Sequence, residues 1–136
     1  MAKQVFTNAV VTVNGTDLSD HIAAVTLDTS ADEIETTAFG TAGWRSRVTG
    51  LKDGSIQLDW HQDFATSSVD SVLSSAFGSV GTVTVMPNGT AIGASNPRYT
   101  ISAVISSYSP VAGSIGDLLT FSTTWAFAGP MARATA

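Results

Sequence analysis

The sequence is poor in charged residues, and this scarcity excludes several classes of protein. It contains 6 Lys+Arg and 11 Asp+Glu among 136 residues, or 12%, whereas about 25% is usual for a soluble domain. A compact monomer of this mass exposes roughly 6,700 Å², which leaves about one charge per 400 Å². Disordered chains are charge-rich and apolar-poor, but 43% of these residues are hydrophobic. The chain is therefore expected to fold and to cover much of its surface in an assembly.

Cysteine is absent, and so are long apolar runs. The lack of cysteine excludes disulfides, thiolate metal sites and cysteine nucleophiles, and it is typical of a protein made in a reducing cytosol. No apolar run approaches the roughly 18 residues of a membrane helix. The first eight residues lack the apolar core of a signal peptide. We therefore expect neither secretion nor membrane insertion.

Basic residues are too few to hold nucleic acid. Residues 1–70 contain ten acids and four bases, a net charge of −6, and residues 71–136 contain one acid and two bases, a net charge of +1. Sequence-independent binding to a phosphate backbone requires clustered Lys and Arg. A chain with this balance would repel DNA rather than grip it.

Alternating patterns predict a mostly β fold in which 17 Ser and 18 Thr supply the polar surface. Strict alternation over residues 55–60 and 119–127 predicts strands with one buried face, and an Asn-Gly pair at 14–15 predicts a hairpin turn. An apolar stripe at helical spacing predicts one helix over 68–77. Further strands are expected at 11–13, 22–29, 82–86 and 98–108. We predict an all-β sandwich or barrel with one flanking helix, in a single domain over 1–136.

The alternation stops between residues 30 and 50. Long loops are uncommon in compact domains and are often functional, and a purely solvated loop has little use for large aromatic side chains such as Phe39 and Trp44. We predict that residues 31–50 form a long loop that orders against a neighbouring subunit; a mobile surface excursion is the alternative. The candidate contact residues are Asp32, Glu33, Glu35, Phe39, Trp44, Arg45 and Arg47.

Signatures of catalysis and metal binding are weak. His21 and His61 are forty positions apart, without metal-ligand spacing, and the sequence has no Gly-x-Ser-x-Gly elbow, P-loop or dinucleotide fingerprint. A Ser-His-Asp triad leaves no local signature, so it stays open at this point. The acids at 53, 59 and 63 could pair as glycosidase carboxylates, but solvated acids on a strand face explain them more simply. We expect no enzymatic activity, no metal and no cofactor.

One stretch, GLKDGSIQLDWHQDF at residues 50–64, resembles the central motif of the tail tube (major tail) proteins of long, non-contractile-tailed bacteriophages, most closely those of phages of actinobacteria. NPRY at 96–99, YSPVAG at 108–113 and GDLLTFSTTW at 116–125 are similar to later segments of that family. The resemblance covers most of the chain from about residue 25. It implies a β-sandwich-like barrel with one flanking helix, in agreement with the patterns above.

The resemblance also implies a structural virion protein, made in the host cytoplasm and carried in the phage tail. Subunits of the family form homohexameric rings that stack into a tube, and DNA crosses the lumen without specific binding. The implied partners are further copies of the chain, the tape measure protein inside the tube, the tail terminator and the distal tail proteins. The family's long early loop coincides with residues 31–50, and its acidic lumen fits the net charge. Asp28, Gln57 and Asp59, which alternate with the predicted core residues, are expected to face the lumen.

Other classes of protein stay open. A tail terminator or head-tail connector is also β-rich and ring-forming, and it differs by stopping at single rings. A small carbohydrate-binding β-sandwich could use Trp44 or Trp60 as a stacking platform, although such secreted modules usually carry a signal peptide and disulfides. A hydrolase is the third alternative, and a substrate panel would detect it.

Overall fold

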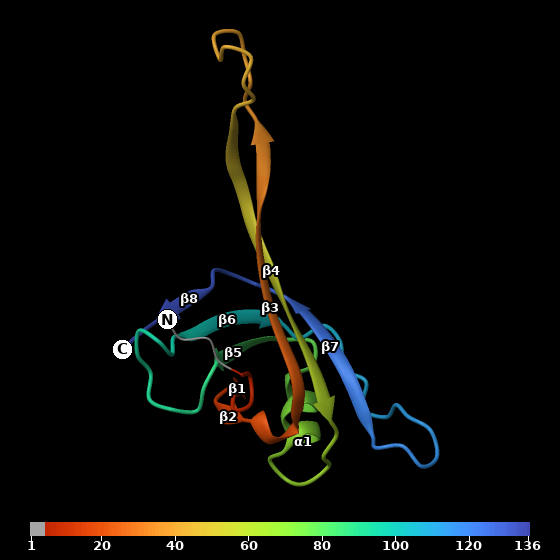
Figure 1. Cartoon of the computed structure of the whole chain (residues 1–136). Coiled ribbons are helices and arrows are strands. Elements are labelled where there is room, and N and C mark those ends of the chain that lie inside the picture. The colour runs from red at the N-terminus through yellow and green to blue at the C-terminus, as the bar shows by residue number, and fades with distance from the viewer. Residues whose placement is uncertain (1–4) are drawn as a thin grey trace.

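The computed structural model describes residues 5–136, whose strands form two antiparallel sheets (Figure 1). The elements are β1 (Val10–Val13), β2 (Thr16–Asp17), the 3₁₀ turn η1 (Ser19–His21), β3 (Ile22–Glu35), β4 (Arg47–His61), α1 (Val69–Ala76), β5 (Val80–Met86), β6 (Arg98–Val104), β7 (Thr120–Ala126) and β8 (Ala132–Ala134). The larger sheet has the order β2-β1-β5-β6-β8, and the smaller sheet has the order β3-β4-β7.

The core lies between the two sheets and follows the alternation in the sequence. In β7, and in β4 from residue 55 onward, every second side chain is buried and the residues between them are more exposed. Trp60 stacks on Phe121 with ring centroids 5.9 Å apart, and Trp125 lies 6.3 Å from Trp60. The larger sheet contributes Val11, Val13, Val83, Val85, Ile101 and Ala103 to the same core. The sandwich predicted from the period-2 pattern is confirmed.

Helix α1 closes part of the core with the apolar stripe that the sequence indicated. Val69, Leu73 and Ala76 are buried, and the helix is one residue shorter at each end than the predicted 68–77. It ends where the Phe77 N–H bonds to the Leu73 carbonyl and Gly78 adopts a φ of +85°, a conformation that glycine adopts without steric cost. No helix within residues 5–136 has the length and apolar content needed to cross a membrane.

The predicted Asn-Gly hairpin turn is confirmed between β1 and β2. Asn14 and Gly15 have φ angles of +50° and +85°, as a type I′ turn requires at both central positions. Val13 pairs with Thr16 directly across this turn.

The prediction of a loop over residues 31–50 is wrong in its bounds. β3 and β4 pair continuously from Ile22↔Trp60 to Glu35↔Arg47, with a bulge between Ala31 and Glu33, and only residues 36–46 connect them. Residues 29–54, here called the arm, project away from the sandwich as a long hairpin (Figure 1). Most of the arm is exposed on both faces, so it has no buried face and the sequence shows no alternation there.

The C-terminal third departs from the sequence prediction in two places. The strand expected over 98–108 ends at Val104. The Ile105 N–H still bonds to the Ser79 carbonyl, but the Ser79 N–H leaves the ladder and bonds to the Ala76 carbonyl at the end of α1. The short β8 strand, which had not been predicted, pairs with β6 at the edge of the larger sheet.

Candidate functional site

The outer face of the β3-β4-β7 sheet is polar. Residues that pair across antiparallel strands share a face, and the register pairs Asp28 with Ser55, Thr26 with Gln57 and Ser122 with Asp59. Asp28, Gln57 and Asp59, which the sequence singled out, therefore lie on one face, opposite the buried Ile56, Leu58 and Trp60. The Ser122 hydroxyl donates a 2.7 Å hydrogen bond to Asp59 Oδ1.

Asp53 lies on the same polar face, although it was not among the residues expected to face the lumen. It stands in an Asp-Gly pair, which is typical of a turn, yet it continues the alternation of residues 55, 57 and 59 and pairs with Ser30. The face therefore carries the carboxylates of Asp28, Asp53 and Asp59. By strand register, no Lys or Arg lies on it between residues 24–30, 53–61 and 120–126. Its other side chains are Ser, Thr, Gln, Ala and His, so the face is electronegative and hydroxyl-rich.

Both edges of this three-stranded sheet are open. In the described part of the chain, β3 pairs with β4 along one edge and has no strand on the other. β7 pairs with β4, and beyond its end a single bridge joins Phe127 to Ala103 of the larger sheet. Unpaired edges present rows of N–H and C=O groups that favour pairing with another chain.

The structure divides the predicted contact residues between the strands and the tip of the arm. Asp32, Glu33 and Glu35 lie on β3 and Arg47 lies on β4, whereas Phe39, Trp44 and Arg45 lie in the connection 36–46. The side chain of Phe39 is fully exposed, and that of Trp44 is 79% exposed. Large aromatic rings in water are typical of surfaces that a partner covers.

Local hydrogen bonds and ion pairs hold the tip of the arm in one shape. The Thr36 N–H bonds to the Ser46 carbonyl at 2.8 Å, and the Trp44 N–H bonds to the Thr41 carbonyl at 3.1 Å. Arg45 lies 3.3 Å from Glu35, and Arg47 lies 4.0 Å from Glu33. Exposed ion pairs add little stability, but together these contacts present the two aromatic rings on an ordered tip.

The arm enlarges the surface of the molecule. The chain exposes 8627 Å², which exceeds by about 1,900 Å² the area expected of a compact monomer of this mass. Five large apolar side chains of the arm contribute to this surface: Ile34, Phe39, Trp44, Val48 and Leu51. So much exposed apolar surface is typical of a subunit that is covered by its neighbours.

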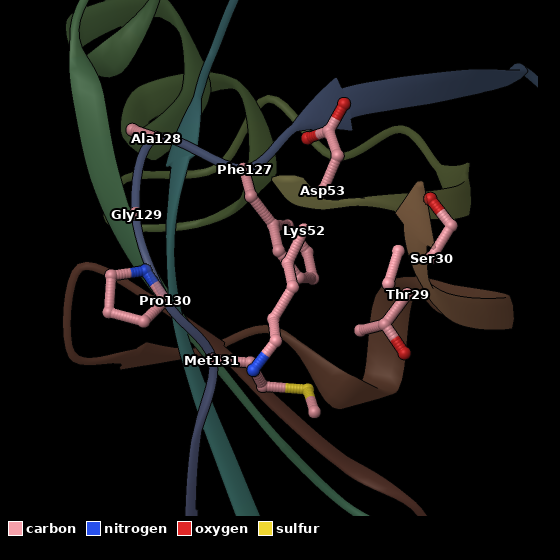
Figure 2. Close-up of a pocket in the computed structure, with 10 residues that line it drawn as sticks. Thr29, Ser30, Lys52, Asp53, Phe127, Ala128, Gly129, Pro130 and Met131 are labelled. Atoms are coloured by element: carbon pink, nitrogen blue, oxygen red, sulfur yellow. The ribbon is translucent and has the colours of Figure 1, made fainter. Parts of the chain in front are cut away.

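An open groove lies at the base of the arm, where the two sheets diverge. A cavity of about 720 Å³ lies between the arm and residues 127–131. The Lys52 side chain points into it and the Asp53 carboxylate points away (Figure 2). A second cavity of about 380 Å³, lined by Val25, Leu27 and Tyr99, shares Thr29 and Met131 with the first. The two cavities therefore form one continuous groove, which is largely apolar.

His21, Asp63 and Ser68 meet beside the N-terminus of α1. Asp63 Oδ2 lies 3.4 Å from His21 Nε2 and accepts a 2.8 Å hydrogen bond from the Ser68 hydroxyl, which is 3.3 Å from the same ring nitrogen. The Ala65 N–H and the Ser68 hydroxyl lower the pKa of Asp63. In a catalytic triad the serine gives its proton to one ring nitrogen and the carboxylate holds the other. Here the carboxylate contacts both the serine and the same ring nitrogen, so the cluster fastens η1 to α1 without triad geometry.

Tyr108 ties α1 to the segment that follows β6. Its hydroxyl donates a 2.6 Å hydrogen bond to Asp70 Oδ1 and accepts one of 3.0 Å from Gln62 Nε2. Burial, together with the bond to Asp70, raises the pKa of Tyr108 to about 12. Within residues 5–136 no three His, Asp or Glu side chains form a group that could hold a metal ion.

Comparisons with known proteins identify the fold. No protein-family profile and no curated protein matches the sequence. A chain from the virion of a native gene transfer agent particle has a TM-score of 0.77 and 17% sequence identity, over 97% of this chain and 99% of that one. A chain from the tail of an empty gene transfer agent particle, with C6 symmetry, has a TM-score of 0.64 and 20% identity, over 85% of this chain and 83% of that one. The predicted fold class, a two-sheet β-sandwich with one flanking helix of the kind found in phage-like tails, is confirmed by these likenesses.

Proposed function

We propose that this chain is a structural, non-enzymatic subunit of a phage-like tail. In this proposal it polymerises as stacked hexameric rings into a tube that conducts DNA from capsid to host cell. The observation that carries the proposal is the fold shared over nearly the whole chain with a virion protein, and also with a protein of a tail that has C6 symmetry. The subunit would reside in the virion tail, around a tape measure protein and between terminator and distal tail proteins.

The open sheet edges support ring formation. The free edge of β3 in one copy can pair with the free edge of β7 in the next, which would extend the sheet around a ring. Because β3 and β7 are different surfaces, the contact is head-to-tail, and a head-to-tail contact gives a closed ring when its rotation closes.

The polar face of the sheet supports a lumen. In such a ring the core would lie on the outer side of the β3-β4-β7 sheet. Its polar face would then point towards the DNA, with the side chains of Asp28, Asp53, Gln57 and Asp59. Carboxylates repel phosphates, and the repulsion is strong within about 10 Å at 0.1 M salt. DNA would therefore slide through the tube without binding to its wall.

The arm supports contacts between subunits. It projects from the sandwich, it is ordered at its tip, and it exposes Phe39 and Trp44. Residues 32–47 would then reach beyond their own subunit and contact neighbouring copies, in the same ring or in the next.

Electron microscopy of the concentrated, purified protein tests the proposal. We expect long tubes in negative stain, because both ring and stacking contacts come from copies of one chain. Single rings that never stack would favour a tail terminator or head-tail connector. Compact monomers at every concentration would contradict both alternatives.

Reversal of charge at Asp59 tests the assignment of the lumen. In Asp59→Arg each subunit changes by two charges, so we expect tubes that retain DNA and eject it less efficiently, with retention weakening as salt is raised. The measurements are DNA delivery by assembled particles and DNA binding by purified tubes as a function of salt.

Asp117 provides the matched control for this experiment. It lies in the exposed connection between β6 and β7, outside the strands that carry the polar face, so Asp117→Arg makes the same charge change without altering a side chain of that face. Asp59→Asn keeps an oxygen that can accept the Ser122 hydrogen bond and removes only the negative charge, so it separates loss of the carboxylate from gain of positive charge. Unchanged DNA delivery and unchanged tube charge in Asp59→Arg would refute the assignment.

A further inference from the structure

The groove at the base of the arm is an apolar surface that its own chain leaves uncovered. Val25 and Leu27 point inwards from β3 and pack on the edge of the core, yet both are only half-buried, because they border the smaller cavity, which Phe6, Val85 and Tyr99 also line. Phe127 and Met131 form the opposite wall and are also half-buried. Burial of these four side chains by a partner would be favourable.

A cation marks the mouth of this groove. The Lys52 side chain extends across the larger cavity towards Met131 (Figure 2). Within residues 5–136, Lys52 makes no ion pair. An unpaired ammonium beside an apolar wall favours an aromatic ring, because the face of a ring attracts cations and its body packs on apolar side chains.

The tip of the arm has the complementary properties, but it is out of reach of its own groove. It exposes the rings of Phe39 and Trp44. The six steps from Thr29 to Glu35 span roughly 20 Å at 3.3 Å per residue, and the connection 36–46 lies beyond them. A hairpin that leads straight away from the groove places its tip in reach of another copy only (Figure 1).

We propose that the groove receives the arm tip of a second copy of this chain, with the rings of Phe39 and Trp44 packed against Phe127 and Met131 beside the Lys52 ammonium. This inference rests on the proposed function, since both require copies of the chain to associate. The groove runs along β3, whose free edge is the proposed ring contact, so the docked tip would extend that interface. The tip of the arm and the groove are different surfaces of one chain. Each docked copy therefore still offers a free tip or a free groove to a further copy.

The exposed connection 110–118 of a second copy is the alternative segment that could occupy the groove. It carries Val111, Ile115 and Leu118, all strongly exposed. These side chains are aliphatic and offer no ring to Lys52, so the tip of the arm fits the chemistry of the groove better. The two occupants predict different neighbours for Thr29, which lines both cavities.

Cross-linking between single-cysteine variants tests the contact without background, because the natural chain has no cysteine. Ala38→Cys marks the tip and leaves both rings in place, and Thr29→Cys marks the groove; both positions are exposed. The two variants are mixed, assembled and treated with a short bismaleimide. We expect a mixed dimer as the main product, whereas a mixture of Thr29→Cys and Ser114→Cys should give little.

Two further variants connect the cross-linked product to the proposed chemistry. Phe39→Ala with Trp44→Ala should lower the cross-link yield about tenfold or more at equal protein concentration, since buried aromatic anchors dominate such contacts. Lys52→Gln should lower it about two- to fivefold, the share expected of a cation beside a ring.

The outcomes separate failure of this inference from failure of the proposed function. Tubes or rings in the micrographs without the Ala38–Thr29 product would overturn docking of the tip and leave the proposed function standing. A main product between Thr29 and Ser114 would assign the groove to the connection 110–118. No assembly of the wild-type chain under any condition would overturn both.

Discussion

Trp44→Ala should give a chain that folds normally and does not form tubes. The side chain is 79% exposed at the tip of the arm, and it does not contribute to the core of its own subunit. Surface substitutions of this kind usually change the free energy of unfolding by about 0.5 kcal/mol or less. Truncation of an aromatic anchor in an interface typically costs about 2 kcal/mol or more per contact. Because every subunit of a tube repeats the contact, the critical concentration for assembly should rise at least about tenfold.

Two variants control for this result. Phe64→Ala removes a ring that is 57% exposed but lies outside the arm, and we expect it to assemble. Trp44→Phe keeps an aromatic ring at the tip and should restore assembly in part. Urea unfolding and circular dichroism report the fold, and sedimentation with negative-stain microscopy reports assembly. Normal tubes from Trp44→Ala would show that the side chain does not anchor a contact between subunits.

The elements that sequence predicts well are those with one buried face. The alternation of residues 55–60 and 119–127 is clear because Ile56, Leu58 and Trp125 must face the core while their neighbours face water. The stripe of α1 has the same origin, since Val69 and Leu73 lie against the sandwich. In each case burial selects residue type at every second position of a strand or every third to fourth position of a helix.

The arm was missed because neither of its faces is buried. Ile34 and Val48 pair with each other and are still about half exposed, so no alternation in residue type is required. Gly50 and Gly54 also make this segment resemble a loop, but close packing accounts for glycine at both positions. A Cβ at Gly54 would come within 2.6 Å of the Asp28 carbonyl oxygen and would meet the ring of Phe127, and one at Gly50 would come within 2.8 Å of Ile34.

Sequence reasoning reached part of the candidate site. The shared face of Asp28, Gln57 and Asp59 follows from alternation, and the register confirms it; their exposure to a lumen stays a prediction. The groove could not be predicted, because Thr29, Lys52 and Met131 are far apart in the chain and only the pairing of β3 with β4 and of β6 with β8 brings their segments together. Open sheet edges are likewise a property of topology, which no local pattern encodes.

The second large effect is expected in the wall of the proposed tube itself. Trp60 is 1% exposed near the end of β4, stacked on Phe121, and its indole N–H donates a 3.0 Å hydrogen bond to the buried hydroxyl of Thr123. Trp60→Ala should lower the free energy of unfolding by about 3–5 kcal/mol. Domains are usually stable by only about 5–15 kcal/mol, so this substitution removes about a fifth or more of the total stability. Urea denaturation at 25 °C measures the loss.

Trp60→Phe with Thr123→Val separates packing from hydrogen bonding in this effect. Trp60→Phe keeps most of the ring but leaves the Thr123 hydroxyl buried without a partner, at a cost of about 1–3 kcal/mol. Adding Thr123→Val removes that orphaned hydroxyl, so the double variant should be more stable than Trp60→Phe alone. Equal stabilities would mean that the hydrogen bond contributes nothing and that packing accounts for the whole effect. In either case the folded fraction should still form tubes, because Trp60 faces the core and the arm and the sheet edges are unchanged; loss of tubes from fully folded protein would contradict the proposed arrangement of the wall.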